Sequence, residues 1–160
     1  MDPVRHFTST GYVAHNGRVL LHWHRKLQMW MPPGGHIEAN EDPSQAIVRE
    51  AEEETGLKVT VWPTTHRFRF EYPVQIPPPI AILEEDIDDP VSGPHRHIDF
   101  IYVLRPETSP PEHVEGWRWV TRAELEACSA LEAPDGEMVA PPEDVAELGL
   151  VALDEASKWR

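Results

Sequence analysis

Proline constrains the fold of this chain more than any other residue. It occurs 17 times in 160 residues, and because its ring fixes φ and removes the backbone N–H, it is excluded from helix interiors and central strands. A content this high can indicate disorder. Here, however, apolar runs alternate with the prolines, so we predict that most prolines separate short elements of a folded domain. A chain of ~150 residues can bury roughly 70% of its unfolded surface, which suffices for one hydrophobic core.

The apolar runs predict a β-rich arrangement. Residues 9–25 contain two such runs joined by Asn16-Gly17, a dipeptide typical of a two-residue hairpin turn. Residues 29–38 contain consecutive prolines and glycines and are predicted to be irregular. The acidic segment 84–90 is expected between or beside strands. Five further strands are predicted at residues 58–62, 66–72, 79–83, 97–104 and 116–120.

Helix signals lie between these strands. Asp42-Pro43 is predicted to start a helix, with Gln45 completing a capping box, and Gly56 is predicted to end it after Thr55. A short capped helix is predicted from residue 121, and a third helix from 142 to about 159. The interleaved order predicts an α/β fold with an α/β/α layered arrangement and a mixed β-sheet. We expect a single domain over residues 1–160, in which the last thirty or so residues form an acidic helical extension.

The charge balance excludes several classes of partner. The chain has 14 basic and 28 acidic residues, a formal net charge of −14. It therefore lacks the broad basic surface with which proteins hold duplex nucleic acid or anionic membranes. A ligand that carries phosphate would need a metal ion. Residues 123–160 contain ten acidic and two basic residues, so we expect this part to form a solubilising, weakly specified surface.

Cysteine content and the chain start bear on location. The single cysteine, Cys128, cannot form an intramolecular disulfide. Residues 1–10 lack the apolar stretch of a signal peptide, and no later stretch approaches ~20 apolar residues. We expect a reducing, cytoplasmic location and no membrane association. The sequence does not indicate an oligomeric state.

Four carboxylates gather near the end of the first predicted helix. Glu50, Glu52, Glu53 and Glu54 repel one another and face the negative end of the helix dipole, which costs a few tenths of a kcal/mol per pair. Residues 50, 53 and 54 are spaced by three and four, so their side chains share one helix face. Hard oxygen ligands in this arrangement suit Mg²⁺ or Mn²⁺ together with substrate phosphates. A solvated acidic face is the alternative for such a run taken alone.

The flanking residues decide between these alternatives. From Gly35 the chain reads glycine, five residues, Glu41, seven residues, and then REAEEETGL over 49–57. This resembles the Nudix box, G-x5-E-x7-R-E-U-x-E-E-x-G-U with U apolar, at every defined position. The opening hairpin, the PPGGHIE approach to the helix, and WRWV followed by a capped short helix also resemble the family, so the resemblance spans most of residues 8–128.

The resemblance implies roles for individual residues. The carboxylates of Glu50, Glu53 and Glu54, with the backbone carbonyl of Gly34, would hold Mg²⁺ or Mn²⁺. Arg49 and Glu41 would form an ion pair that orients these ligands. Glycines fit this position because a backbone oxygen reaches a metal only where no side chain blocks it. The residues that we nominate for substrate contacts are Arg25, Gly35, Arg67 and Tyr72.

The resemblance also implies a reaction. Family members typically hydrolyse a nucleoside diphosphate linked to another group, by attack of water on phosphorus with a metal neutralising the developing charge. The general base could be Glu50 or Glu53 inside the box. Candidates outside it are Glu84, Glu85, Glu112 and Glu115, of which we prefer Glu112 and Glu115 because they precede the WRWV strand.

Substrate identity is less constrained. Phosphates could meet Arg25, Lys26, Arg67, Arg69 or Arg96, and a base could stack on Trp30, Phe68, Phe70 or Tyr72. Pro73, sixteen residues past Leu57, has a spacing that resembles ADP-ribose hydrolases. Tyr72, at fifteen, is close to a spacing seen in dinucleoside polyphosphate hydrolases. The short chain favours NTPs or dNTPs, including oxidised forms, as substrates.

Three alternatives complete the sequence-based picture. A Nudix-fold isoprenoid diphosphate isomerase would need a catalytic cysteine near the chain start, and the only cysteine is Cys128. A nucleotide-binding regulatory module would usually lose the box glutamates, which this chain keeps. His95, His97 and Asp99 alternate and should share a sheet face, yet no cysteine or further histidine completes a tetrahedral zinc set in the sequence.

Overall fold

The Asn16-Gly17 dipeptide forms the predicted hairpin turn. In the computed structural model, which describes residues 2–159, Asn16 and Gly17 have φ values of 48° and 72°. Positive φ at both central residues defines the turn type whose twist matches that of paired strands. The turn joins strand β1 (Arg5–His15) to strand β2 (Arg18–His24), which confirms the opening hairpin.

Strand β1 organises an eight-stranded mixed sheet in the order β3-β2-β1-β7-β5. It pairs antiparallel with β2 and parallel with β7 (Gly93–Pro106), from Arg5 opposite Arg96 to Val13 opposite Leu104. Strand β4 also pairs with β1, β6 with β7 and β8 with β2. The remaining strands of this sheet are β3 (Met29–Met31), β4 (Gly34–His36), β5 (Val59–Val61), β6 (Ala81–Asp89) and β8 (Arg118–Thr121). A separate two-stranded sheet pairs β9 (Leu131–Glu132) with β10 (Met138–Val139).

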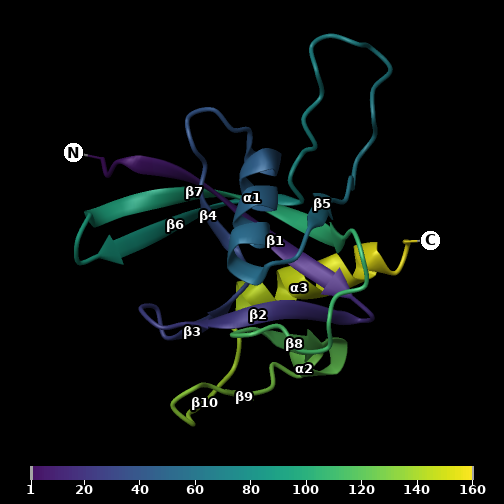
Figure 1. Cartoon of the computed structure of the whole chain (residues 1–160). Coiled ribbons are helices and arrows are strands. Elements are labelled where there is room, and N and C mark those ends of the chain that lie inside the picture. The colour runs from purple at the N-terminus through teal and green to yellow at the C-terminus, as the bar shows by residue number, and fades with distance from the viewer. Residues whose placement is uncertain (1, 160) are drawn as a thin grey trace.

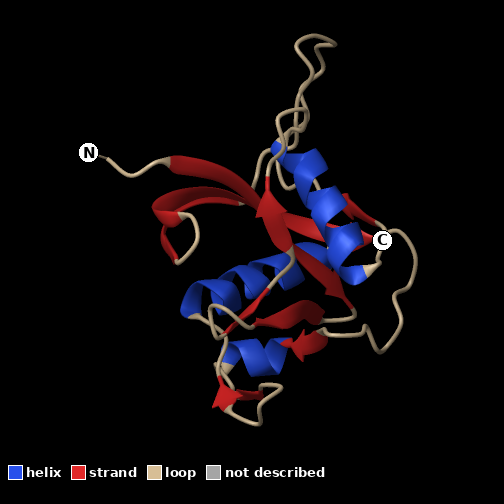
Figure 2. Ribbon diagram, turned by 60° about the vertical axis from the view of Figure 1, so that its left-hand side comes forward, coloured by secondary structure: helices blue, strands red, loops and turns tan. Residues whose placement is uncertain are grey.

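Two helices cover opposite faces of the sheet. Helix α1 (Pro43–Thr55) lies in front of β1 in Figure 1 and helix α3 (Glu143–Ala156) lies behind it, and Figure 2 shows the same layers after rotation. Side chains alternate between the two cores: Tyr12 packs in the α3 cluster and Val13 in the α1 cluster. This confirms the α/β/α arrangement with a mixed sheet. A short third helix, α2 (Arg122–Glu126), follows β8. None of the helices between residues 2 and 159 has the length and apolar content needed to cross a membrane.

Helix α1 begins and ends where the sequence predicts. The Asp42 side chain accepts from the backbone N–H groups of Ser44 and Gln45, and the Gln45 side chain accepts from the Asp42 N–H, so the capping box is complete. Gly56 ends the helix with a φ of 73°. The helix lies close to β1 because residue 11 is glycine: a Cβ there would lie 2.7 Å from Ile47 Cγ1 on the helix.

The C-terminal segment is more than a weakly specified surface, which corrects our expectation for residues 123–160. Helix α3 buries Val145, Ala146, Ala152 and Leu153 against the sheet. These positions repeat at helical spacing, so the acidic residues occupy the outward face while the apolar stripe contributes to the core. Local charge counting missed this stripe.

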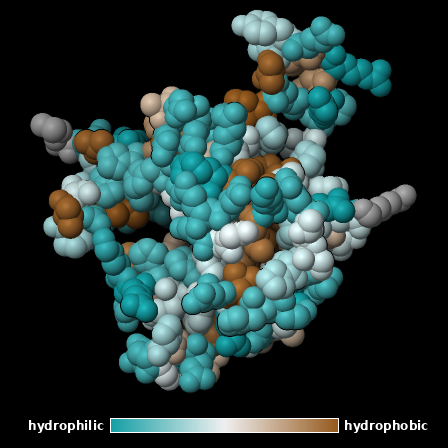
Figure 3. All heavy atoms as spheres, in the orientation of Figure 1, coloured by the Kyte–Doolittle hydropathy of each residue, from teal (hydrophilic) through white to brown (hydrophobic). Residues whose placement is uncertain are grey.

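The strand predicted at residues 66–72 is wrong. Residues 63–80 form a long loop that projects beyond α1 (Figure 1), and Figure 3 shows hydrophobic side chains exposed on it. Phe68 and Phe70 are each 55% exposed and Tyr72 is 88% exposed. Alternating side chains produce a strand only where a neighbouring strand accepts the backbone hydrogen bonds and one face is buried. Here the loop is held by a side chain, because Gln75 bonds to the backbone of both His66 and Phe68.

Two further boundaries differ from the prediction. The acidic segment 84–90 is largely inside β6, an edge strand whose residues alternate between half-buried and exposed, and charged side chains protect such edges. Residues 29–38 are not wholly irregular, because β3 and β4 each form three-residue pairings. Strand β4 pairs on one side only, with β1, so the prolines that precede it at 32 and 33 interrupt no further pairing.

Candidate functional site

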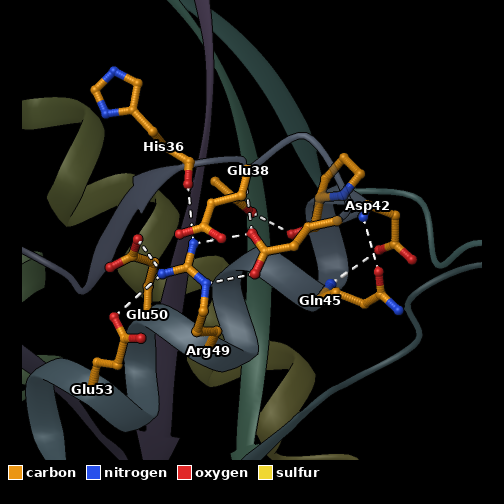
Figure 4. A network of polar contacts seen from close by, with 10 residues as sticks. His36, Glu38, Asp42, Gln45, Arg49, Glu50 and Glu53 are labelled. Carbon is orange, nitrogen blue, oxygen red and sulfur yellow. Dashed lines mark hydrogen bonds and ion pairs between the residues drawn. The ribbon is translucent and has the colours of Figure 1, made fainter.

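Arg49 is the centre of a polar network between α1 and the loop before it (Figure 4). Its guanidinium donates from Nε and a terminal nitrogen to both carboxylate oxygens of Glu41, at 2.5 and 3.0 Å. It also donates to Glu50 at 2.8 Å, to Glu53 at 3.3 Å and to the backbone carbonyl of His36 at 3.2 Å. One planar side chain thus fixes the loop and two carboxylates of the helix relative to one another.

The electrostatics of this network favour permanent ionisation. Hydrogen bonds to Glu41 and then Glu50 raise the pKa of Arg49 above its usual range. The hydrogen bond from Arg49 lowers the pKa of Glu41, and the backbone N–H of Glu38 adds to this effect. Both partners are charged at neutral pH, so the brace persists across the physiological range.

Gly34 and Gly35 bring the backbone of β4 against α1. A Cβ at Gly35 would lie 2.4 Å from a carboxylate oxygen of Glu50, and one at Gly34 would lie 2.8 Å from the carbonyl oxygen of Ser9. The Gly34 N–H donates to Glu54 at 3.2 Å. The close approach of strand and carboxylates therefore depends on the absence of side chains at these two positions.

Glu54 is the most perturbed carboxylate of the helix. Burial raises its pKa to about 7, with the nearby charges of Glu50 and Glu53 acting in the same direction and the Gly34 N–H opposing them. Desolvation and like charges both disfavour the ionised form. A cation bound here would relieve both costs, and perturbed carboxylates of this kind gather at functional sites.

Two contacts that the sequence did not reveal hold the ends of α1. The Ser9 hydroxyl donates to the Pro43 carbonyl at 2.7 Å at the start of the helix. The Trp117 indole donates to the Glu54 carbonyl at 3.1 Å near its end. Trp117 belongs to the predicted WRWV region, but its partner could not be identified without the fold.

The nominated residues of the box and Gly34, which precedes it, lie together around the loop–helix junction; the box residues are Gly35, Glu41, Arg49, Glu50, Glu53 and Glu54. Glu112 lies elsewhere, which corrects our preference for it as a loop base. Both of its carboxylate oxygens accept from Arg18 beside the hairpin turn, and this pairing lowers its pKa. Along β1, Arg18 pairs with His15, whereas β4 pairs with residues 8–10. The two pairing positions on β1 are therefore five residues apart, which is about 17 Å in a strand.

Among the described residues, the other candidates outside the box make no hydrogen bond or ion pair with it. Glu115 is exposed, two residues before Trp117. Arg25 lies in the exposed turn between β2 and β3, and Arg67 and Tyr72 lie on the projecting 63–80 loop. In the described part of the chain these three residues make no hydrogen bond or ion pair with the box. Glu84 on β6 pairs with Arg5 and Arg96, and Glu85 faces His97 in the neighbouring strand.

The donor set of the box fits a hard divalent cation. One junction brings together the carboxylates of residues 50, 53 and 54 and the backbone of the Gly34–Gly35 pair. A Cβ at Gly35 would fill the space beside the Glu50 carboxylate. Oxygen ligands with room for water suit Mg²⁺ or Mn²⁺. A cavity of about 940 Å³ adjoins the helix on the side of Arg49 and Glu53 and extends toward β5 and Pro77.

The sequence-based argument against a zinc set needs correction. His95 and His97 do share a face, with their Nε2 atoms 3.1 Å apart, but Asp99 turns to the hydroxyls of Thr8 and Thr10. A further histidine does join them, because the parallel pairing of β1 and β7 places His6 opposite His97. The long-range pairing of these two strands could not be read from either segment.

Comparison with known proteins agrees with this geometry. The NUDIX domain family model matches residues 5–141. A Nudix-family hydrolase from Clostridium perfringens has a TM-score of 0.69 and 30% identity, with 94% of this chain and 97% of that chain covered. An ADP-ribose pyrophosphatase from Streptococcus suis has the same fold, with a TM-score of 0.55, 16% identity, and 97% and 93% coverage.

A shorter match is closer in sequence. An 8-oxo-dGTP diphosphatase from Haemophilus influenzae is 48% identical over 44 residues, which are 28% of this chain, so the match spans about a third (32%) of that curated relative. The family model covers most of the chain, and the box residues that define the family meet at one junction. The chain therefore belongs to the Nudix hydrolases, which act on phosphorus-containing anhydrides.

Proposed function

We propose that this Nudix hydrolase cleaves a nucleoside diphosphate linked to another group, with Mg²⁺ or Mn²⁺ as cofactor, and that NTPs or dNTPs, including oxidised forms, are its substrates. The observation that carries this proposal is the Arg49 network, which braces Glu41, Glu50 and Glu53 at the Gly34–Gly35 junction. A preorganised carboxylate site of this kind would hold a divalent cation in place, and that cation would neutralise the negative charge that develops during phosphoryl transfer.

The residues divide into ligands and supports. Glu50, Glu53 and Glu54 with the Gly34 carbonyl would hold the cation, and Arg49 and Glu41 would orient them. The bound ion would neutralise the diphosphate and lower the pKa of water. Glu53, whose side chain is 61% exposed, can reach a water molecule at the surface of the site, so it is our first choice of general base, with Glu50 as the second. Glu115 is the loop alternative.

The short match to an 8-oxo-dGTP diphosphatase supports the nucleotide-sanitising assignment, because the matched segment is 48% identical to that enzyme. Hydrolysis of ADP-ribose is the second candidate, supported by the shared fold with the Streptococcus suis enzyme and by the Pro73 spacing. Hydrolysis of dinucleoside polyphosphates is the third candidate, supported by the Tyr72 spacing. A nucleotide-binding module without hydrolytic activity is disfavoured because every box carboxylate is retained.

A phosphate-release screen would test the proposal. Purified protein with Mg²⁺ or Mn²⁺ is assayed against dNTPs, oxidised dNTPs, ADP-ribose, dinucleoside polyphosphates and nucleotide sugars. We expect one nucleotide class to be cleaved, and Glu53→Gln and Glu54→Gln each to lower kcat by orders of magnitude while circular dichroism stays unchanged.

Glu52→Gln is the matched control on the same helix. Glu52 has no hydrogen bond or ion pair to Arg49 or the glycine pair among the described residues, so this variant should keep the wild-type kcat. Wild-type turnover in both Glu53→Gln and Glu54→Gln would reject the proposed site, and activity on none of these compounds would reject the reaction class.

A further inference from the structure

Three histidines from two strands converge at the end of the sheet near the N-terminus. His6 on β1 lies opposite His97 on β7, and His95 lies two residues before His97 on the same strand. One ring nitrogen from each of the three lies within 4.8 Å of the others. The ring centroids of His6 and His95 are 4.5 Å apart, and those of His95 and His97 are 5.0 Å apart.

This histidine cluster lies on the opposite face of the sheet from the Nudix carboxylates. Side chains alternate along β7, so His95 and His97 share a face with Ile101, which packs in the core under α3. Glu50, Glu53 and Glu54 belong to α1, which covers the other face. The cluster therefore cannot share an ion with the box.

The hydrogen bonds of His95 prepare one nitrogen for a metal. Its Nδ1 lies 2.8 Å from the Gly93 carbonyl oxygen, which can only accept, so Nδ1 carries the proton. In the neutral ring Nε2 then presents a lone pair, and this atom lies 3.1 Å from Nε2 of His97. A ring that donates one N–H to a backbone carbonyl and presents its other nitrogen is the usual state of a metal-binding histidine.

The surroundings favour a cation. Glu85 lies opposite His97 on β6, and the buried Asp99 lies two residues further along β7. The neighbouring cations Arg5 and Arg96 are engaged by Glu84 on the other side of the strands. The His36 ring packs edge-on against His97 at 5.1 Å, and Figure 4 shows this ring pointing away from the Arg49 network.

We propose that His6, His95 and His97 bind one transition-metal ion of the Zn²⁺ class, with water as the fourth ligand. Neutral imidazoles prefer Zn²⁺, Ni²⁺ and Cu²⁺ over Mg²⁺. Zn–N bonds of ~2.0–2.1 Å in tetrahedral geometry need nitrogens roughly 3.3 Å apart. The His95–His97 pair already has nearly this spacing, and a small rotation of the partly exposed His6 ring brings its nitrogen into range. The site is independent of the proposed hydrolysis.

Equilibrium dialysis against Zn²⁺ in excess Mg²⁺ tests this proposal, with bound metal counted by mass spectrometry. We expect one Zn²⁺ per wild-type chain and at least tenfold weaker binding in both His6→Asn and His97→Asn. Co²⁺ bound in place of Zn²⁺ should give the intense visible absorption of a four-coordinate ion in the wild type only. His6 is partly exposed, so its variant should keep the metal-free melting temperature of the wild type.

Two matched controls separate the histidine cluster from other sites. His66→Asn, on the exposed 63–80 loop, and the Glu53→Gln/Glu54→Gln double variant should both bind Zn²⁺ like the wild type. Absence of Zn²⁺ binding by the wild type, or equal binding by the His6 and His97 variants, would overturn the proposal. Loss of Zn²⁺ from the double glutamate variant would instead assign the ion to the box and would also reject the histidine site.

Discussion

At the scale of single residues, the site depends on glycine at position 35, which has no side chain. Gly35 leaves room for the Glu50 carboxylate, since a methyl group there would lie 2.4 Å from the Oε1 atom of Glu50. In Gly35→Ala this carboxylate must turn away and lose its bond to Arg49. We expect kcat/KM to fall at least tenfold, as is typical when support of a metal ligand is lost.

A double-mutant cycle checks this steric explanation. Glu50→Asp withdraws the carboxylate by one methylene, so Gly35→Ala should destabilise the Glu50→Asp protein less than it destabilises the wild type. The free energy of unfolding of the four proteins is measured by urea titration. Equal losses in both backgrounds would show that Gly35 is required for a reason other than contact with Glu50.

His22 provides a pH-dependent contribution to stability. Burial lowers its pKa to about 4, with His24 acting in the same direction, and its ring packs against Trp117 with the ring centroids 4.5 Å apart. The unfolded chain, with a histidine pKa near 6.5, therefore binds more protons between about pH 4 and 6.5. The contribution of His22 to the free energy of unfolding is therefore fully present above pH 6.5 and is lost as the pH drops through this window.

The His22→Gln variant measures this contribution. Between pH 6.5 and 4 the wild type should lose on the order of 1–2 kcal/mol more than the variant, a figure reduced for the partial exposure of the ring. Urea titrations at several pH values, in the presence of a chelator, give the slope of the free energy of unfolding against pH for each protein. The burial of His97 also lowers its pKa to about 4, so a residual slope should persist in His22→Gln. Identical slopes in the two proteins would contradict the prediction.

At the scale of elements, the sequence was sufficient to predict those features that depend on contacts between residues close together in the chain. The Asn16-Gly17 turn, the Asp42–Gln45 capping box and the Gly56 helix end each depend on residues within a few positions, and the structure confirms all three. The box residues also could be nominated from sequence, because the loop and helix that carry them are contiguous. Their joint geometry around Arg49 follows from that continuity.

Pairing between distant segments could not be read from the sequence. The alternating residues 66–72 have the pattern of a strand but no partner, whereas the acidic 84–89 segment pairs with β7 and becomes one. The same limit hid the histidine cluster, which exists only because β1 runs parallel to β7. Glu112 was misjudged for a related reason, since the position of Arg18 depends on the hairpin register.

The projecting 63–80 loop should be the first site of proteolysis. It carries the exposed Arg67 and Arg69, and its internal hydrogen bonds come mainly from Gln75. Proteases cleave exposed loops with few backbone contacts. Limited trypsin digestion, read by intact mass, should cut after Arg67 or Arg69 before any other site, and Arg67→Gln/Arg69→Gln should slow the first cut. A first cut at Arg25 or Lys26, in the short turn tied to His24, would contradict this prediction.

At the scale of the whole molecule, the charge of −14 is divided unevenly. Twelve of the 14 basic residues lie within residues 1–122, the part that contains the box. Several of them are neutralised by local acids: Arg18 by Glu112, Arg96 by Glu84 and Asp86, and Arg49 within its network. The field at the carboxylate junction therefore stays unfavourable for an anion until a divalent cation binds.

This balance predicts that the metal controls substrate affinity. A non-hydrolysable nucleoside diphosphate analogue should bind at least tenfold more weakly in a chelator than in excess Mg²⁺, because the cation reverses the local charge that the polyphosphate meets. Isothermal titration calorimetry gives both dissociation constants. The Glu53→Gln/Glu54→Gln protein should lose the gain from Mg²⁺, whereas the uncharged nucleoside should bind the wild type equally with and without the ion. If the analogue binds the wild type with the same affinity in both conditions, local basic residues rather than the metal must hold the phosphates, and the carboxylate junction would not be the diphosphate site.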